Sequence, residues 1–246
     1  MAEAIRTATG PVQAKLSLPG SQLITEQALM IAALTDGVSE LTGMRFSKTT
    51  RALIESLHQL GIVIQADPYE KSCIVAGSGG KAPRKQASIH CGQSKTVARF
   101  LLSLCASTPG VYHFEGHGKL ENYLWANILS LLTQQGAQVI PNGIYKMPFT
   151  LAGADALEGG DFNLDSSIPG QLISALLITA PYAKMPVKIA VHNEKTYPNI
   201  DITSAIMGEF GALVHRLYQG QYLVPVPQRY ASRDYQVEPD LNLAPY

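Results

Sequence analysis

The 246-residue chain balances 19 Lys and Arg residues against 19 Asp and Glu residues, so its formal net charge at neutral pH is zero. Because 46% of its residues are hydrophobic and only 15% are charged, the composition is typical of a packed globular protein and excludes disordered, collagenous and coiled-coil chains. Without a basic surplus there is no electrostatic reason to expect nucleic acid or an anionic membrane as a partner.

The start of the chain lacks the basic segment and following apolar segment of a secretory signal. The most apolar stretch, residues 172–183, has about twelve residues where a membrane span needs roughly twenty. The three cysteines are odd in number and show no close pairing, which predicts free, buried thiols in a reducing compartment. Together these features predict a cytoplasmic protein.

One pattern occurs three times along the chain, at even spacing. A helical pattern ends at a glycine and a short β-branched strand follows: HQLGIVI at Gly61, TQQGAQV at Gly136 and GEFGALV at Gly211. An apolar strand precedes each of these helices, and before it comes a helix that is apolar on almost every face. These inner helices are expected at about residues 27–34, 99–106 and 171–180. The repeated unit is therefore β-α-β-α-β-β.

A helix that is apolar on every face must be surrounded by protein. The pattern therefore predicts one α/β (α+β) domain with pseudo-threefold symmetry over residues 15–226, with repeats at about 15–86, 87–156 and 157–226. Three buried inner helices would meet at the centre, with sheets and outer amphipathic helices around them. The polar, proline-rich tail, residues 227–246, is expected to be extended or mobile.

If the inner helices are parallel, their N-terminal ends face the same side and attract anions through the helix dipole and free N–H groups. Small and polar residues gather at these ends. Ser21, Thr96 and Ser167 are either ligand contacts or simple N-caps. Arg99 is expected in the first turn of its helix, where its charge opposes the dipole, so a bound anion or an internal acid must compensate it.

At these segments the sequence resembles the enolpyruvyl transferases of the EPSP synthase (3-phosphoshikimate 1-carboxyvinyltransferase) family. LPGSQLITEQALMIAAL is similar to the family motif PGSKSxxNRALLLAAL, and GQSKTVARFL to GNAGTAMRFL. DSSIPGQLISALLITAPYA is similar to DGSxSSQFLSALLMAAPLA, and TYPNIDIT to SKPYIDxT. The resemblance runs in order along essentially the whole chain.

The resemblance implies a fold of two similar domains, each with three βαβαββ units, that close around the substrates. The implied reaction transfers the enolpyruvyl group of phosphoenolpyruvate to shikimate 3-phosphate in aromatic amino acid (chorismate) biosynthesis, with no cofactor and no metal. This chain resembles the N-terminal domain, with residues 1–14 and 227–246 as crossover segments. The acid/base carboxylates belong to the second domain, so no catalytic residue is assigned in this chain.

The resemblance also implies a set of substrate-binding positions. They are Ser21, Gln22, Gln27, Gln93, Lys95, Arg99, Tyr123, Ser167, Gln171, Thr196 and Asn199. Gln22 stands where the family has a lysine, and Gln27 and Tyr123 stand where it has arginines. Arg99 and Gln171 are retained, and Lys95 is a cation new to the pocket rim. Because a charge-assisted hydrogen bond contributes about 1.5 to 3 kcal/mol, these substitutions predict a degenerate active site.

Three functions remain open. The chain is a half enzyme that is inactive alone and needs a complementary C-terminal domain or partner chain, or it is a non-catalytic binding domain derived from the family. In the third, it is half of a transferase with a different, less anionic acceptor. A small anionic ligand, shikimate 3-phosphate or phosphoenolpyruvate, is expected for the first.

His113 and His117 fall on a strand and a loop, which argues against a metal site.

Overall fold

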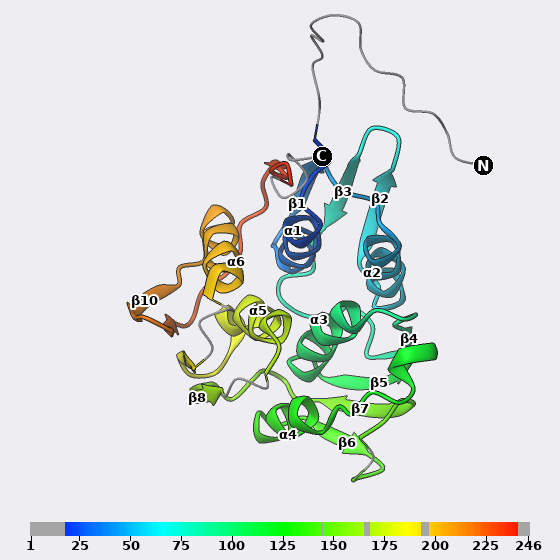
Figure 1. The fold of residues 1–246 in the computed structure, drawn as a ribbon, viewed down its shortest axis with the longest axis vertical. Helices are drawn as coiled ribbons and strands as arrows, with labels where there is room; N and C mark the ends of the chain where they lie inside the picture. The colour runs from blue at the N-terminus through cyan, green and yellow to red at the C-terminus, as the bar shows by residue number, and fades with distance from the viewer. Residues whose placement is uncertain (1–17, 144, 165–167, 193–196, 241–246) are drawn as a thin grey trace, which may run out of the picture.

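The computed structural model describes residues 18–143, 145–164, 168–192 and 197–240 and contains three βα units around a common centre (Figure 1). The second unit is β4 (Gln86–His90), α3 (Lys95–Ala106), β5 (Gly110–Glu115), α4 (Ala126–Gln134), β6 (Gln138–Ile140) and β7 (Phe149–Gly153). The third is β8 (Gly160–Leu164), α5 (Gly170–Thr179), β9 (Val187–Val191), α6 (Tyr197–Glu209), β10 (His215–Tyr218) and β11 (Gln221–Val224). The first contains α1 (Gln22–Leu34), β1 (Val38–Thr42), α2 (Lys48–Gln59), β2 (Val63–Asp67) and β3 (Ser72–Ala76).

Each unit carries a four-stranded sheet with the same topology. The orders are β12-β1-β3-β2, β4-β5-β7-β6 and β8-β9-β11-β10, where β12 is Tyr235–Gln236. In every sheet the first pair is parallel and the other two pairs are antiparallel. The predicted pseudo-threefold α/β fold is therefore confirmed.

The inner helices α1, α3 and α5 lie at the centre, with α2, α4 and α6 farther out (Figure 1). Every residue from 25 to 34 in α1 and from 97 to 106 in α3 is buried. The outer helices α2 and α4 bury only one face, as amphipathic helices do. Within the described parts of the chain, no helix combines the length and apolarity that crossing a membrane requires.

The inner helices run in the same direction. Side-chain hydrogen bonds join their early turns to early turns and their late turns to late turns. From the N-terminal to the C-terminal ends, these bonds are Arg99–Gln171 (3.2 Å), Gln27–Ser174 (3.4 Å), Ser103–Thr179 (2.8 Å) and Tyr182 to the Leu34 carbonyl (2.6 Å). Their N-terminal ends therefore face one side of the domain, as predicted, and we call this side the mouth.

Each outer helix ends at a glycine in the left-handed region. The φ angles of Gly61, Gly136 and Gly211 are 90°, 94° and 88°, which a side chain rarely adopts. In each case the glycine N–H donates to the carbonyl three residues earlier, and the next N–H donates to the carbonyl five residues before it. This C-terminal cap turns the chain into the following strand and explains why the pattern recurs.

The tail was predicted to be extended or mobile, and the structure shows the extended alternative. Residues 227–240 pack on the domain, and Tyr235 and Gln236 pair in parallel with Leu41 and Thr42 of β1. This strand, β12, takes the place in the first sheet that β4 and β8 hold in the others. The predicted start of the first repeat, at about residue 15, lies outside the described residues. The polar composition of the tail did not indicate a sheet strand, because only alternate side chains around Tyr235 are buried.

The buried tyrosine of the tail gives a direct test. Tyr230 is 1% exposed and donates from its hydroxyl to the Ile178 carbonyl of α5 at 2.9 Å. Tyr230→Ala is expected to lower the free energy of unfolding by about 3 to 5 kcal/mol, as large aromatic truncations in cores do. Urea unfolding measures it, with Tyr69→Ala as control because Tyr69 is 90% exposed. Equal stability of the two variants would show that the tail is not part of the core.

Candidate ligand site at the inner-helix ends

The first turns of two inner helices are capped by serine side chains. The Ser21 hydroxyl accepts from the Ile24 N–H at 3.5 Å at the start of α1, and the Ser94 hydroxyl accepts from the Val97 N–H at 3.3 Å at the start of α3. Helix α5 begins after Pro169, which offers no side-chain cap. Ser21 therefore caps α1, which is one of the two roles that the sequence left open for it.

Helix α3 begins earlier than the sequence indicated, which moves two predicted residues. Thr96, for which a ligand contact and an N-cap were both left open, is the second residue of the helix, and Ser94 is the N-cap. Arg99 was expected in the first turn but lies in the second, because the helix starts at Lys95. Helices extend over polar first turns when a cap is present, and the apolar pattern alone does not reveal that turn.

Arg99 is a buried cation with neutral partners. Its side chain is 7% exposed, Nη1 donates to Gln171 Oε1 at 3.2 Å, and Nη2 donates to the Tyr123 hydroxyl at 3.3 Å. Its Nε–H has no hydrogen-bond partner. The sequence had left an internal acid as one way to compensate this charge, and none bonds to it within the described residues. A guanidinium in this setting is suited to an external anion.

Lys95 places a second positive charge beside the first. Its Nζ lies 4.0 Å from the centroid of the Tyr123 ring, and Cζ of Arg99 lies 5.9 Å from the same centroid. The centroid of this ring lies 4.7 Å from that of the Trp125 ring in a T-shaped arrangement, and Trp125 is fully buried and precedes α4. The Tyr123 ring therefore contacts both cations and is held in place by Trp125.

This charge arrangement is unfavourable without a partner. The two cations lie within about 10 Å of each other, where like charges repel by roughly 1.7 kcal/mol at an effective dielectric constant near 20. Both also lie in the first two turns of α3, at the positive end of the helix dipole. A bound anion would relieve both effects.

The α1 side of the mouth carries an acid that the sequence analysis missed. Glu26 is 3% exposed and accepts a hydrogen bond from Gln22 Nε2 at 2.9 Å. Burial raises the pKa of Glu26 to about 7, and the bond from Gln22 partly offsets that rise. Its position within an otherwise apolar helix was the available signal, because a buried charge normally has a partner.

Gln27 ends a chain of hydrogen bonds whose direction can be assigned. The Thr203 hydroxyl donates to the Asn199 carbonyl at 2.7 Å, so the Ser174 hydroxyl donates to Thr203 at 2.8 Å. Gln27 Nε2 then donates to Ser174 at 3.4 Å. Its Oε1 is left buried without a donor. At its contact with α5, helix α1 therefore holds a buried acceptor without a donor.

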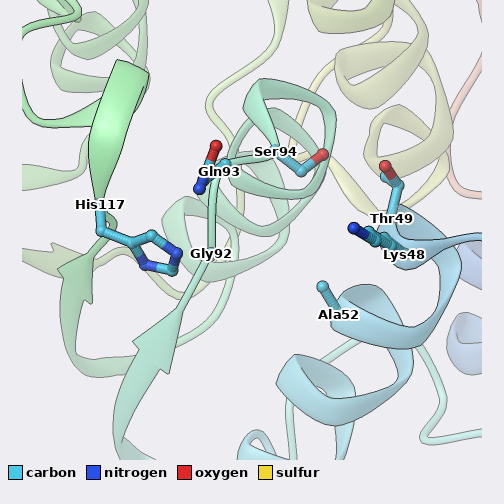
Figure 2. A pocket seen from close by; sticks show the side chains of 7 residues that line it. All are labelled: Lys48, Thr49, Ala52, Gly92, Gln93, Ser94 and His117. Carbon is cyan, nitrogen blue, oxygen red and sulfur yellow. The ribbon is translucent and has the colours of Figure 1, made fainter.

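Gln93 does not join the Arg99 cluster. It lines a cleft of about 350 Å³ between the first turn of α2 and the loop that precedes α3 (Figure 2). The other lining residues are Lys48, Thr49, Ala52, Gly92, Ser94 and His117. Ser167 and Thr196 fall outside the described residues. The structure thus brings Lys95, Arg99, Tyr123 and Gln171 together, and it links Gln27 through Ser174 and Thr203 to the backbone carbonyl of Asn199.

The described residues contain no group of three His, Cys, Asp or Glu side chains that could hold a metal ion. Cys73, Cys91 and Cys105 are free and buried, as predicted. Burial raises the pKa of Cys73 and of Cys91 to about 12, so both remain protonated thiols at neutral pH. They are not nucleophiles of the site.

Comparison with known proteins gives a consistent match. The family model for EPSP synthase (3-phosphoshikimate 1-carboxyvinyltransferase) matches residues 6–246. A 3-phosphoshikimate 1-carboxyvinyltransferase of Trichormus variabilis is 34% identical over 99% of this chain and 57% of its own length, and one of Nostoc punctiforme is 35% identical over 96% and 56%. EPSP synthase from Acinetobacter baumannii superposes with a TM-score of 0.83 at 20% identity, over 94% of this chain and 51% of its own. The chain spans about half the length of these proteins.

The raised pKa of Glu26 predicts a pH-dependent stability. The folded chain holds this proton up to about pH 7, whereas the unfolded chain releases it near pH 4.5. The stabilisation from Glu26 is therefore complete below pH 4.5 and is lost as the pH rises through 7. Glu26→Gln, which stays neutral, is expected to gain up to roughly 3 kcal/mol relative to the parent chain between these limits.

Urea unfolding from pH 4.5 to 8 measures this difference. Glu55→Gln is the matched control, because Glu55 is an exposed carboxyl on a helix. Parallel pH profiles of Glu26→Gln and the parent chain would contradict a buried, unpaired Glu26.

Proposed function

Because the chain belongs to the EPSP synthase family, we propose that it supplies the substrate-binding half of an enolpyruvyl transfer site. The observation that carries the proposal is Arg99, a buried cation whose hydrogen-bond partners among the described residues are both neutral, where α3 meets α5. The phosphate or carboxylate of phosphoenolpyruvate is an anion of the kind that this guanidinium lacks. The acceptor in this proposal is shikimate 3-phosphate, as in the family.

The proposed transfer needs groups beyond this cluster. The acceptor hydroxyl must lose a proton as its oxygen bonds to the enolpyruvyl carbon, and inorganic phosphate leaves. Proton transfer of this kind requires a positioned acid or base. The groups that bond to Arg99 are an amide and a phenol, which are poorly suited to that role at neutral pH. We therefore assign the acid/base carboxylates to a complementary C-terminal domain, supplied by the same polypeptide or by a partner chain.

A second candidate concerns the acceptor. Helix α1 itself contains no Lys or Arg, and Glu26 near its start is an acid. A dianionic acceptor would lose charge-assisted bonds of about 1.5 to 3 kcal/mol each on that side. This favours an acceptor with hydroxyl donors and less negative charge, and such a protein would be a transferase half with a different acceptor.

Complementation tests the proposal. The chain is mixed with phosphoenolpyruvate and shikimate 3-phosphate, alone and with the part of the Trichormus variabilis relative that it does not match. We expect no phosphate release by the chain alone and release above background in the mixture. The relative's part alone serves as control.

Two outcomes would contradict the proposal. Release by the chain alone would show that it carries its own acid/base groups. Absence of release in the mixture would leave a binding domain without transferase function if calorimetry still detects phosphoenolpyruvate. Replacing shikimate 3-phosphate by shikimate separates the two acceptors, since faster release with shikimate supports the second candidate.

A further inference from the structure

One face of α2 carries a cation, a methyl group and a carboxylate in line. Lys48, Ala52 and Glu55 stand at positions i, i+4 and i+7, which lie on the same side of an α-helix. Seven residues of helix separate the two charged residues by about 10 Å along the axis, too far for them to neutralise each other. Neither belongs to an ion pair of the described residues. Helix α2 therefore presents two opposite charges with an apolar gap between them.

This face of α2 forms one wall of two adjoining clefts. The first, of about 350 Å³, contains Lys48, and the second, of about 400 Å³, contains Glu55 and Glu115. Both clefts are lined by Ala52, Gly92 and His117. They therefore form one continuous groove, which we call the α2 groove. Figure 2 shows the Lys48 ammonium and the His117 ring pointing toward the gap from opposite sides.

The acidic end of the α2 groove has one internal cation partner. Glu115 Oε1 lies 2.5 Å from His90 Nδ1, and both residues line this end. Glu55 reaches the same end from α2 and has no ion pair within the described residues. Even with a protonated His90, this end keeps one uncompensated negative charge. The other end keeps the positive charge of Lys48.

The second unit indicates that the fold does not require these charges. Its outer helix α4 borders a cleft of about 300 Å³ beside the end of β8. Asn127 and Ser130 line that cleft at the positions that Ala52 and Glu55 hold in α2, nine and six residues before the capping glycine. None of the described residues that line this second cleft is charged. The same architecture therefore forms with a neutral cleft.

We propose that the α2 groove binds a small ω-amino carboxylate, which has a carboxylate at one end and an ammonium group at the other, as free lysine does. The carboxylate bonds to the Lys48 ammonium and the Thr49 hydroxyl, and the methylene chain lies along Ala52. The ligand's cation lies between Glu55 and Glu115. A molecule with only one of the two charges leaves one end of the groove without a partner.

The inference goes beyond the proposed function, because the α2 groove is separate from the anion cluster. Among its described lining residues are neither Arg99 nor Tyr123. Its volume is within the range of small-molecule sites. The groove therefore holds its ligand independently of phosphoenolpyruvate.

The test is a titration with three probes of equal chain length, 6-aminohexanoate, hexanoate and hexylamine, at constant ionic strength. Calorimetry measures affinity, and the amide chemical shifts of Thr49 and Gly92 locate the bound probe. We expect 6-aminohexanoate to bind at millimolar concentration and to shift both amides. Hexanoate and hexylamine, which lack one ion pair each, are expected to bind about threefold to fivefold more weakly.

Two variants assign the ends of the ligand. Lys48→Gln is expected to weaken 6-aminohexanoate about threefold to fivefold and to leave hexylamine unchanged. Glu55→Gln is expected to weaken 6-aminohexanoate by a similar factor and to leave hexanoate unchanged. A general loss of structure would weaken all three probes together, and urea unfolding of each variant checks for it.

Lys188→Gln and Asp161→Asn are the matched controls. These two residues line a separate cleft on the third sheet, where they stand opposite each other on paired strands. Both variants are expected to bind the three probes as the parent chain does.

Four results would overturn the inference. They are equal affinity of the parent chain for the three probes, no binding of 6-aminohexanoate at millimolar concentration, equal weakening by the control variants, and displacement of 6-aminohexanoate by phosphoenolpyruvate. The first, second and fourth use the parent chain, so the test does not depend on how the variants fold. The complementation assay is separate, since transfer can fail while the α2 groove binds its probe.

Discussion

Three helices with almost no polar face can leave water only by packing against one another, and the rest of the structure depends on that constraint. Each unit buries its inner helix under the other two, so no unit completes its core alone. The few polar side chains inside, such as Ser103 and Thr179, bond to each other. Because the helices are parallel, their electropositive ends meet at one mouth. The location of the candidate site therefore follows from burial.

The sequence alone was sufficient to predict the features that burial and helix capping determine. The evenly spaced glycines marked the outer-helix ends, and Ser21 caps α1, one of its two predicted alternatives. The sequence was insufficient to predict contacts between residues that lie far apart along the chain. Strand β12 completes the first sheet from the tail, and nothing in the local pattern of Tyr235 indicates a pairing with Leu41. Side-chain direction was also hidden, so the contact between Lys95 and Tyr123 emerged only from the fold.

The inner-helix ends differ in charge. Where α3 meets α5, Lys95 and Arg99 gather positive charge around one aromatic ring. Helix α1 instead carries Gln22, the buried Glu26 and the buried, unsatisfied amide oxygen of Gln27. An anionic group is stabilised beside the two cations, and a hydrogen-bond donor is stabilised beside the α1 acceptors.

The central claim is that the inner-helix ends form an anion site around Arg99. Diffraction from crystals grown with phosphoenolpyruvate tests it most directly. The account predicts density for the phosphate or carboxylate of the ligand within hydrogen-bonding distance of the Arg99 guanidinium. Ligand density confined to the cleft beside Lys48, or a carboxylate side chain of this chain bonded to Arg99 Nε, would contradict the account.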